Sequence, residues 1–143
     1  MHLSEMPATV RERLLNQELP EYDLTDCVVG PDLAKRRIAI ITTAGLHRRD
    51  DDAFTAGVGE YRVIPDDTDM ADLMMSHVST NFDRSGFLQD FNVVFPIERL
   101  RELADEGVIG SVAKYHYAFM GATPPTAHAA IAADLATTMR AGK

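Results

Sequence analysis

The sequence predicts an α/β fold with a mostly parallel sheet flanked by helices. Apolar segments of strand length alternate along the chain with segments whose apolar residues recur at helical spacing. The clearest strand signal covers residues 38–41, which carry no charge and are rich in isoleucine. An apolar run without alternation is typical of a strand that is covered on both faces, as in parallel sheets. The predicted order is helix, three strands, helix, strand, helix.

The size and composition fit one globular domain. The chain has 143 residues, of which 45% are hydrophobic and 25% charged, as expected for a protein with a packed core. Within this single domain, residues 1–36 are predicted as an N-terminal helix and connector, and residues 37–143 as the α/β part. The last predicted element is a helix that would normally lead into another strand. We therefore expect part of a larger α/β unit, or a protomer that completes its sheet in a homo-oligomer.

Charge and hydropathy limit the partners. The formal net charge of −8 argues against nucleic acid or an anionic membrane as the main partner. No apolar run approaches the roughly 18 residues of a membrane-spanning helix, and no basic segment followed by an apolar one marks a secretory signal. We expect a cytoplasmic protein. The single cysteine, Cys27, excludes an internal disulfide and is interpreted as a small apolar core residue rather than a nucleophile.

The first half of the chain has four predicted segments besides the strand at 38–41. Residues 7–17 are predicted as a helix and residues 20–36 as an irregular connector. Residues 48–52, two arginines and three aspartates, are interpreted as a solvated loop, because charge clusters usually lie at the surface. The three aspartates could instead hold a hard cation, but they lack the alternating ligand spacing of a metal-binding loop. Residues 60–64 are predicted as a second strand that ends at a proline.

The middle of the chain combines an ambiguous segment with a clear helix. Residues 69–79 fit a helix or a strand, and we favour a short strand. Residues 80–89 are predicted as a loop. Residues 96–106 carry an apolar stripe at helical spacing, start with a proline, and are followed by Gly107, which suits a left-handed cap.

The C-terminal part predicts a strand and a helix. Residues 113–120 are predicted as the third main strand, within which His116 is expected to pack. A last helix is expected with Thr126 as its cap and His128 exposed at its start. Its apolar stripe, expected to be the most exposed association surface, consists of Ile131, Leu135 and Met139.

Small and polar residues follow the first strand at its end. In open α/β sheets ligands bind at the carboxyl ends of strands, so we expect Thr42, Thr43, Gly45 and His47 to lie there, at the end of a central parallel strand. The threonine hydroxyls can bind a carboxylate or cap the turn. Gly45 suits a tight turn or a close approach of the backbone to a ligand.

Three further side chains have both a functional and a structural interpretation. Arg62 can grip a substrate carboxylate through two parallel hydrogen bonds, or form a surface ion pair. His47 and His77 can bind a metal or move protons, or serve the structure only. A zinc site made of His47, His77 and Asp83 is an alternative that no ligand spacing supports.

Six short segments occur in a characteristic order across residues 37–121. They are TTAGLH at 42–47, YRVIP at 61–65, SH at 76–77, an aspartate at 90 followed by NVVFPIERL at 92–100, GVIG at 107–110, and FMG at 119–121. Together they resemble the selenoprotein B family of glycine, sarcosine, betaine and D-proline reductases. The resemblance covers well over half of the chain and matches the N-terminal part of the family.

The resemblance implies a subunit or N-terminal portion of a reductive enzyme that cleaves the C–N bond of an amino acid or betaine with a selenol or thiol nucleophile. It also implies other reductase subunits or a thioredoxin-like donor as partners. The family's selenocysteine or cysteine is expected downstream of Lys143, so we predict that this chain alone is inactive and has no cofactor or metal of its own. The candidate substrate-binding residues are Thr42, Thr43, Gly45, His47, Arg62, Ser76, His77, Asp83 and Asn92.

Two other functions stay open. The first is a non-catalytic binding or scaffold protein that keeps the fold without the nucleophile, and a more distant one is a metal-dependent hydrolase. The chain is expected to be an N-terminal fragment, a product truncated near a recoded stop codon, or a stand-alone relative.

Overall fold

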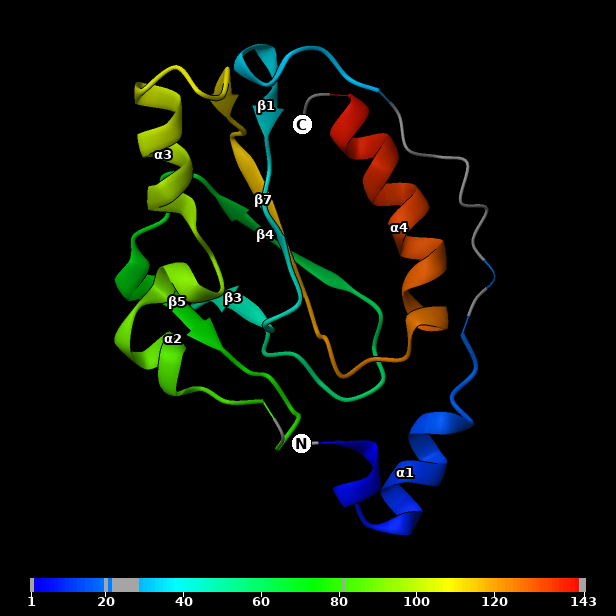
Figure 1. Ribbon diagram of the computed structural model, residues 1–143. Coiled ribbons are helices and arrows are strands. Elements are labelled where there is room, and N and C mark those ends of the chain that lie inside the picture. The colour runs from blue at the N-terminus through cyan, green and yellow to red at the C-terminus, as the bar shows by residue number, and fades with distance from the viewer. Residues whose placement is uncertain (1, 20, 22–28, 81, 142–143) are drawn as a thin grey trace.

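The computed structural model describes residues 2–19, 21, 29–80 and 82–141 (Figure 1). The helices are α1 (Ala8–Leu15), α2 (Ser85–Gln89), α3 (Ile97–Asp105) and α4 (Pro125–Arg140). The strands are β1 (Arg37–Ile38), β2 (Ile41–Thr42), β3 (Leu46–Arg48), β4 (Tyr61–Pro65), β5 (Leu73–Met75), β6 (Ser111–Val112) and β7 (Tyr115–Phe119). Short 3-10 turns occupy Leu3–Glu5, Leu33–Lys35, Met70–Asp72 and Phe91–Val93.

The strands form small sheets of mixed direction. The largest has the order β2-β7-β4, in which β2 runs parallel and β4 antiparallel to β7. β1 pairs with β6 in parallel, and β3 pairs with β5 in antiparallel. The α/β class is therefore observed, whereas the expected mostly parallel sheet is not. Two of the four strand pairs among the described residues, β3–β5 and β4–β7, are antiparallel, which gives the sheets their mixed direction.

The first predicted strand is interrupted and lies at an edge. Residues 38–41 are divided between β1 and β2, because the backbone N–H of Ile40 donates to the ring of His116 where the strand would continue. β2 is an outer strand of its sheet, and β7 is the central one. Ile41 is 53% exposed. The expectation of a central strand buried on both faces was therefore wrong.

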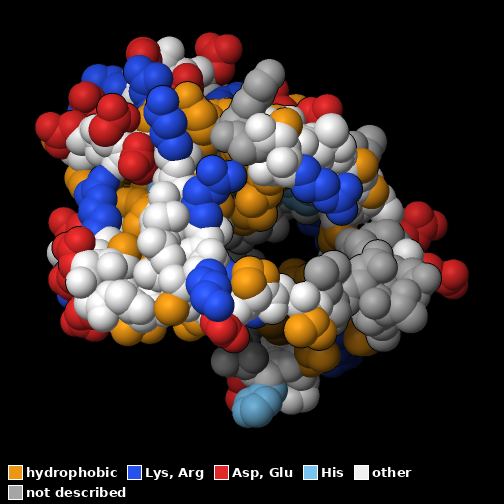
Figure 2. Space-filling view, turned by 90° about the horizontal axis from the view of Figure 1, so that it is seen from above, with side chains coloured by type: hydrophobic (Ala, Val, Ile, Leu, Met, Phe, Trp, Pro, Cys, Tyr) orange, Lys and Arg blue, Asp and Glu red, His pale blue; other side chains and the backbone are white. Residues whose placement is uncertain are grey.

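Two apolar clusters cover the two faces of β7. His116 and Ala118 point to one face, where Phe95 and Ile97 lie, and Tyr117 and Phe119 point to the other, where Leu135 of α4 packs. Figure 1 shows α2 and α3 on one side of the sheet and α4 on the other. In Figure 2, which views the molecule from above, acidic and basic side chains are interspersed on the left, the side on which α3 lies. Ile131 and Met139 pack with Leu135 against the second cluster. The α4 stripe thus faces the sheet and is not the exposed surface that the sequence suggested.

Local signals placed the helices well. α1 and α3 fall inside their predicted ranges. Gly107 has a φ of 73°, and the backbone N–H groups of Gly107 and Val108 donate to Ala104 and Leu103, which closes α3 with a Schellman motif. α4 starts at Pro125 with Pro124 as its N-cap, so Thr126 is not the cap.

Three further outcomes concern the remaining predictions. The stretch predicted as a loop at 80–89 contains the short helix α2, and the strand predicted within 69–79 is limited to β5. Cys27 lies outside the described residues, so its burial stays a prediction. Among the helices that the structure describes, none is both long and apolar enough to cross a membrane.

Candidate functional site

The turn between β2 and β3 is a buried backbone junction. Gly45 has a φ of 68°, its N–H donates to the Phe119 carbonyl at 2.9 Å, and its carbonyl accepts from the Ser76 N–H at 3.0 Å. A Cβ at this position would lie 3.1 Å from both the backbone N and the Cα of His77. The positive φ and the close neighbouring chain both require glycine here. Of the roles predicted for Gly45, a close backbone approach is observed, and the approaching backbone is that of His77, while a contact with a ligand stays a prediction.

Several candidate side chains meet around Phe54, and we call His47, Phe54, Arg62 and Ser76 the Phe54 cluster. Phe54 is 4% exposed, and its backbone N–H donates to the Ser76 Oγ at 2.8 Å. The His47 ring lies edge-on to the Phe54 ring at 6.4 Å, and the Arg62 guanidinium carbon lies 4.7 Å from the ring centroid. Sequence reasoning missed Phe54, because no spacing pattern marks it.

The Arg62 side chain is directed into the protein. It is 13% exposed. Its Nε donates to the Asp52 carbonyl at 2.9 Å, and its two terminal nitrogens contact the Tyr61 carbonyl at 3.2 Å and a Glu60 carboxylate oxygen at 3.1 Å. This arrangement satisfies much of the guanidinium's donor capacity within the chain, so Arg62 holds the loop before β4 in place.

The two candidate histidines are buried in different surroundings. The His47 Nδ1 lies 2.8 Å from the Arg48 carbonyl, which requires that this nitrogen carry the proton and donate it. His77 stacks on Phe82 with 4.3 Å between ring centroids, and its Nδ1 accepts from the Ser79 N–H at 3.2 Å. Burial, with a smaller effect of the nearby Arg84 guanidinium, lowers the pKa of His77. His77 is therefore a neutral acceptor at neutral pH.

The other candidate residues lie outside the Phe54 cluster. The Thr42 Oγ1 accepts from the Ala44 N–H at 3.3 Å, whereas Thr43 lines an apolar groove beside α4. Asp83 accepts hydrogen bonds from the hydroxyl and the N–H of Ser85, which lower the pKa of the Asp83 carboxyl. The Asn92 side chain bonds to both the carboxylate and the N–H of Glu98. Asp83 and Asn92 thus organise the starts of α2 and α3.

No metal site was found at the candidate histidines. Within the described ranges, no three His, Cys, Asp or Glu side chains lie close enough together to hold a metal ion. The zinc alternative built on His47, His77 and Asp83 therefore gains no support from the geometry.

A cavity of about 670 Å³ opens next to the Phe54 cluster, and we call it the charged cavity. It lies where β3 and β4 end and β5 begins. Its lining residues are Arg48, Arg49, Asp50, Pro65, Asp67, Thr68, Asp69 and Asp72. Sequence reasoning interpreted its arginines as part of a solvated loop, because charge clusters usually lie at the surface. Their proximity to the 66–69 turn comes from strand pairing and is not visible in the sequence.

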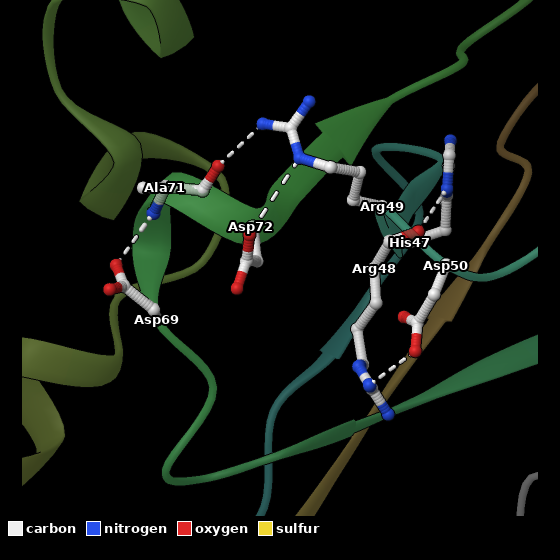
Figure 3. Close-up of polar contacts among 7 residues, drawn as sticks. All are labelled: His47, Arg48, Arg49, Asp50, Asp69, Ala71 and Asp72. Atoms are coloured by element: carbon white, nitrogen blue, oxygen red, sulfur yellow. Dashed lines mark hydrogen bonds and ion pairs between the residues drawn. The ribbon is translucent and has the colours of Figure 1, made fainter.

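Polar contacts fix the walls of the charged cavity (Figure 3). Arg48 pairs with Asp50 at 2.6 Å, while a terminal nitrogen of Arg49 donates to the Ala71 carbonyl at 2.9 Å. The Arg49 Nε lies 3.7 Å from an Asp72 oxygen. The His47 ring, through its bond to the Arg48 carbonyl, connects the Phe54 cluster to this wall. Of the residues predicted from the sequence, His47 thus contacts this wall, and none of them is among the residues that line the cavity.

Comparisons with known proteins give a consistent match. The family model for glycine/sarcosine/betaine reductase selenoprotein B matches residues 16–143. The chain is 38% identical over 94 residues to the D-proline reductase subunit gamma of Acetoanaerobium sticklandii, which covers 65% of this chain and 38% of that protein. It is 30% identical over 95 residues to the sarcosine reductase complex component B subunit beta of Peptoclostridium acidaminophilum, covering 63% and 22% respectively. The matches thus span well under half of either relative, and no solved structure matches the chain.

Proposed function

This chain belongs to the glycine/sarcosine/betaine reductase selenoprotein B family, and we propose that it is a subunit, or the N-terminal portion, of a selenol- or thiol-dependent reductase. The observation that carries the proposal is the family match over residues 16–143. Two relatives support it, since one is a subunit of D-proline reductase and the other a subunit of a sarcosine reductase complex.

The proposed reaction is reductive cleavage of the C–N bond in a small amino acid or betaine, such as glycine, sarcosine, betaine or D-proline. A selenol or thiol supplies the nucleophile for such a reaction. The sequence has one cysteine, Cys27, which lies within the residues that the family model matches but upstream of the six segments that carry the resemblance. We propose that the nucleophile comes from a segment outside these 143 residues, and the two electrons from a thioredoxin-like donor.

The role proposed for this chain is to hold and orient the substrate. We propose that it does so in the cytoplasm, as a homo-oligomer or in a complex with other reductase subunits. The Phe54 cluster is rigid, because His47, Arg62 and Ser76 each have a hydrogen bond to the backbone around Phe54 or Arg48. A rigid frame of this kind suits the positioning of a substrate site, since small displacements of a substrate reduce the rate strongly.

A non-catalytic scaffold protein is the second candidate function. It is favoured by the Arg62 side chain, whose nitrogens contact the chain's own carbonyls and Glu60 instead of facing the charged cavity. On this alternative, the same polar contacts maintain a fold whose task is to bind other subunits.

The test compares the chain alone with the assembly that forms around it in its own cells. The tagged protein is purified with its partners and assayed with dithiothreitol for release of ammonia or amine from glycine, sarcosine and betaine, and for ring opening of D-proline. We expect turnover from the assembly and none from the recombinant 143-residue chain. A stable assembly that turns over none of the four substrates would favour the scaffold function.

A further inference from the structure

We propose that the charged cavity is a binding site for a small zwitterion, a molecule with one cationic nitrogen and one carboxylate. The inference rests on the proposed function for the kind of zwitterion, a small amino acid or betaine. It deepens that function by assigning the binding to residues that the sequence analysis interpreted as a solvated loop. It depends on positively and negatively charged side chains that line the same cavity and have donors and acceptors left over for a ligand.

The cavity is framed by paired strands. Arg48 is the last residue of β3 and faces Leu73, the first residue of β5, in the antiparallel register. The backbone N–H of Arg49 donates to the Asp72 carbonyl at 2.8 Å, which extends this pairing past the end of β3. The paired strands fix the backbone positions of both arginines. Binding a ligand therefore does not have to order this backbone, which lowers the entropic cost of binding.

The arginines retain donors for a carboxylate. A guanidinium has five N–H groups. Arg48 uses one terminal nitrogen for Asp50, and Arg49 uses one for the Ala71 carbonyl. The distance of 3.7 Å between the Arg49 Nε and Asp72 is too long for a hydrogen bond. Both guanidinium groups can therefore offer further N–H groups to a ligand carboxylate, the partner that their planar geometry fits best.

The turn after β4 supplies acceptors for a cationic nitrogen. The Asp67 carboxylate has no hydrogen bond or ion pair among the described residues. Asp69 uses its Oδ1 to accept from the Ala71 N–H at 2.9 Å and leaves its Oδ2 available. Neither carboxylate is neutralised by a cation of the chain within the described ranges, so a ligand ammonium would find uncompensated negative charge here.

The balance of charges distinguishes a zwitterion from a simple anion. Two arginines face four aspartates, Asp50, Asp67, Asp69 and Asp72, so the lining has an excess of negative charge. A carboxylate alone would meet this excess at close range and be repelled. A zwitterion places its cationic nitrogen against the unpaired aspartates and its carboxylate against the arginines. Both halves of the molecule are therefore required for tight binding.

The experiment measures binding to the recombinant 143-residue chain by calorimetric titration with glycine and with glycine betaine. Acetate and tetramethylammonium are the comparators that carry only one charge. We expect at least one of the two zwitterions to bind, and both comparators to bind about tenfold more weakly or not at all. Acetate that binds as tightly as the better zwitterion, or the absence of binding by both zwitterions, would overturn the inference.

Two substitutions in the cavity and two outside it locate the site. Arg49→Gln and Asp67→Asn should each weaken zwitterion binding by about tenfold. Arg99→Gln and Asp105→Asn, which change the same residue types on α3 away from the cavity, should leave it unchanged. The melting temperature of each variant shows whether it is folded. Equal affinity in the cavity variants and the wild-type chain would show that the ligand binds elsewhere.

Failure of this inference is distinguishable from failure of the proposed function. If the reductase assembly is active but the charged cavity variants bind zwitterions normally, the cavity assignment is wrong and the function stands. If zwitterion binding depends on Arg49 and Asp67 while the assembly turns over no substrate, the cavity assignment stands and the reductase function fails.

Discussion

The Nδ1 of His116 accepts a 2.9 Å hydrogen bond from the backbone N–H of Ile40, which lies 76 residues away in the sequence. This bond occupies the gap between β1 and β2. His116 is fully buried and lies edge-on to Phe95, with 5.4 Å between ring centroids. Because Nδ1 accepts, the neutral ring carries its proton on Nε2, which has no hydrogen-bond partner among the described residues. The fold thus depends on a neutral imidazole in its centre.

This arrangement predicts a loss of stability on mild acidification. Burial lowers the pKa of His116 to about 4, an effect that Asp66 opposes and Arg101 reinforces. Between pH 6.5 and 4 the unfolded chain binds a proton at His116 that the folded chain does not, so the free energy of unfolding falls as the pH falls. The full loss is about 3 kcal/mol below pH 4. Above pH 6.5 the ring is neutral in both states, so this group should not make the stability depend on pH there.

The measurement is urea unfolding of the wild-type chain and of His116→Gln from pH 4 to 7.5. The variant should be less stable at pH 7.5 but show a flatter dependence on pH in this interval, because the titrating ring is gone. The exposed carboxylates Asp83 and Asp90, whose pKa values hydrogen bonds lower, titrate in the same way in both proteins. Identical pH slopes would show that His116 does not carry the effect.

A second prediction separates crowding from backbone strain at glycines. Gly45 and Gly57 both have a positive φ, of 68° and 80°. A Cβ at Gly45 would contact the His77 backbone at 3.1 Å, whereas a Cβ at Gly57 would meet no described heavy atom within 4 Å. Gly57→Ala should cost about 1 kcal/mol from strain alone. Gly45→Ala should cost roughly 1–3 kcal/mol more, because the adjoining backbone must move.

Denaturant unfolding of both glycine variants provides the comparison. The contacts with His77 also predict that Gly45→Val impairs stability more than ligand binding. Equal losses in the two alanine variants would mean that the β2–β3 junction relaxes easily and that crowding is unimportant.

A third prediction concerns Arg62. Arg62→Gln should destabilise the chain by about 1–3 kcal/mol, because the Asp52 carbonyl and Glu60 lose a charged donor in a largely buried position. Arg99→Gln, which removes an exposed ion-pair partner of Glu102, should cost less than about 1 kcal/mol. Arg62→Lys keeps the charge but not the forked geometry. A loss of zwitterion binding in Arg62→Lys without loss of stability would show that Arg62 grips the ligand directly.

The parts of the fold that the sequence predicted are those set by nearby residues. α3 and its Gly107 cap follow from an apolar stripe and a terminal glycine, which act within a few residues of each other. The division of residues 38–41 into β1 and β2 could not be predicted, because it involves the ring of His116, which lies on the neighbouring strand β7 but 76 residues away in the sequence. The mixed strand directions could not be predicted either, because they depend on which strands pair across long stretches of sequence.

The candidate site was located in part. The sequence identified His47, Arg62 and Ser76, which the fold brings together. Their contacts in the structure are with the chain's own backbone, and their role in substrate binding stays a prediction. It missed Phe54, which joins them, because a lone aromatic residue in a loop carries no pattern. It also left the arginines after β3 in a solvated loop, since the turn that completes the charged cavity comes from a separate stretch of sequence.

The last prediction tests whether Ser76 is a structural support of the Phe54 cluster. Its Oγ accepts the 2.8 Å hydrogen bond from the Phe54 N–H, and Phe54 is buried. Ser76→Ala would leave that N–H without its acceptor, at a cost of about 1–3 kcal/mol. In Ser85→Ala, the lost hydroxyl belongs to an exposed contact with Asp83, so stability should change by less than about 0.5 kcal/mol.

Amide hydrogen exchange at Phe54 provides a local measurement. The Phe54 N–H can exchange with solvent only when its hydrogen bond is broken, and in Ser76→Ala there is no such bond to break. We expect faster exchange of the Phe54 amide in that variant beyond the change shared by the whole domain, and no such change in Ser85→Ala. Unaltered protection of the Phe54 amide in Ser76→Ala would mean that this hydrogen bond does not hold the loop, and the supporting role assigned to Ser76 would be wrong.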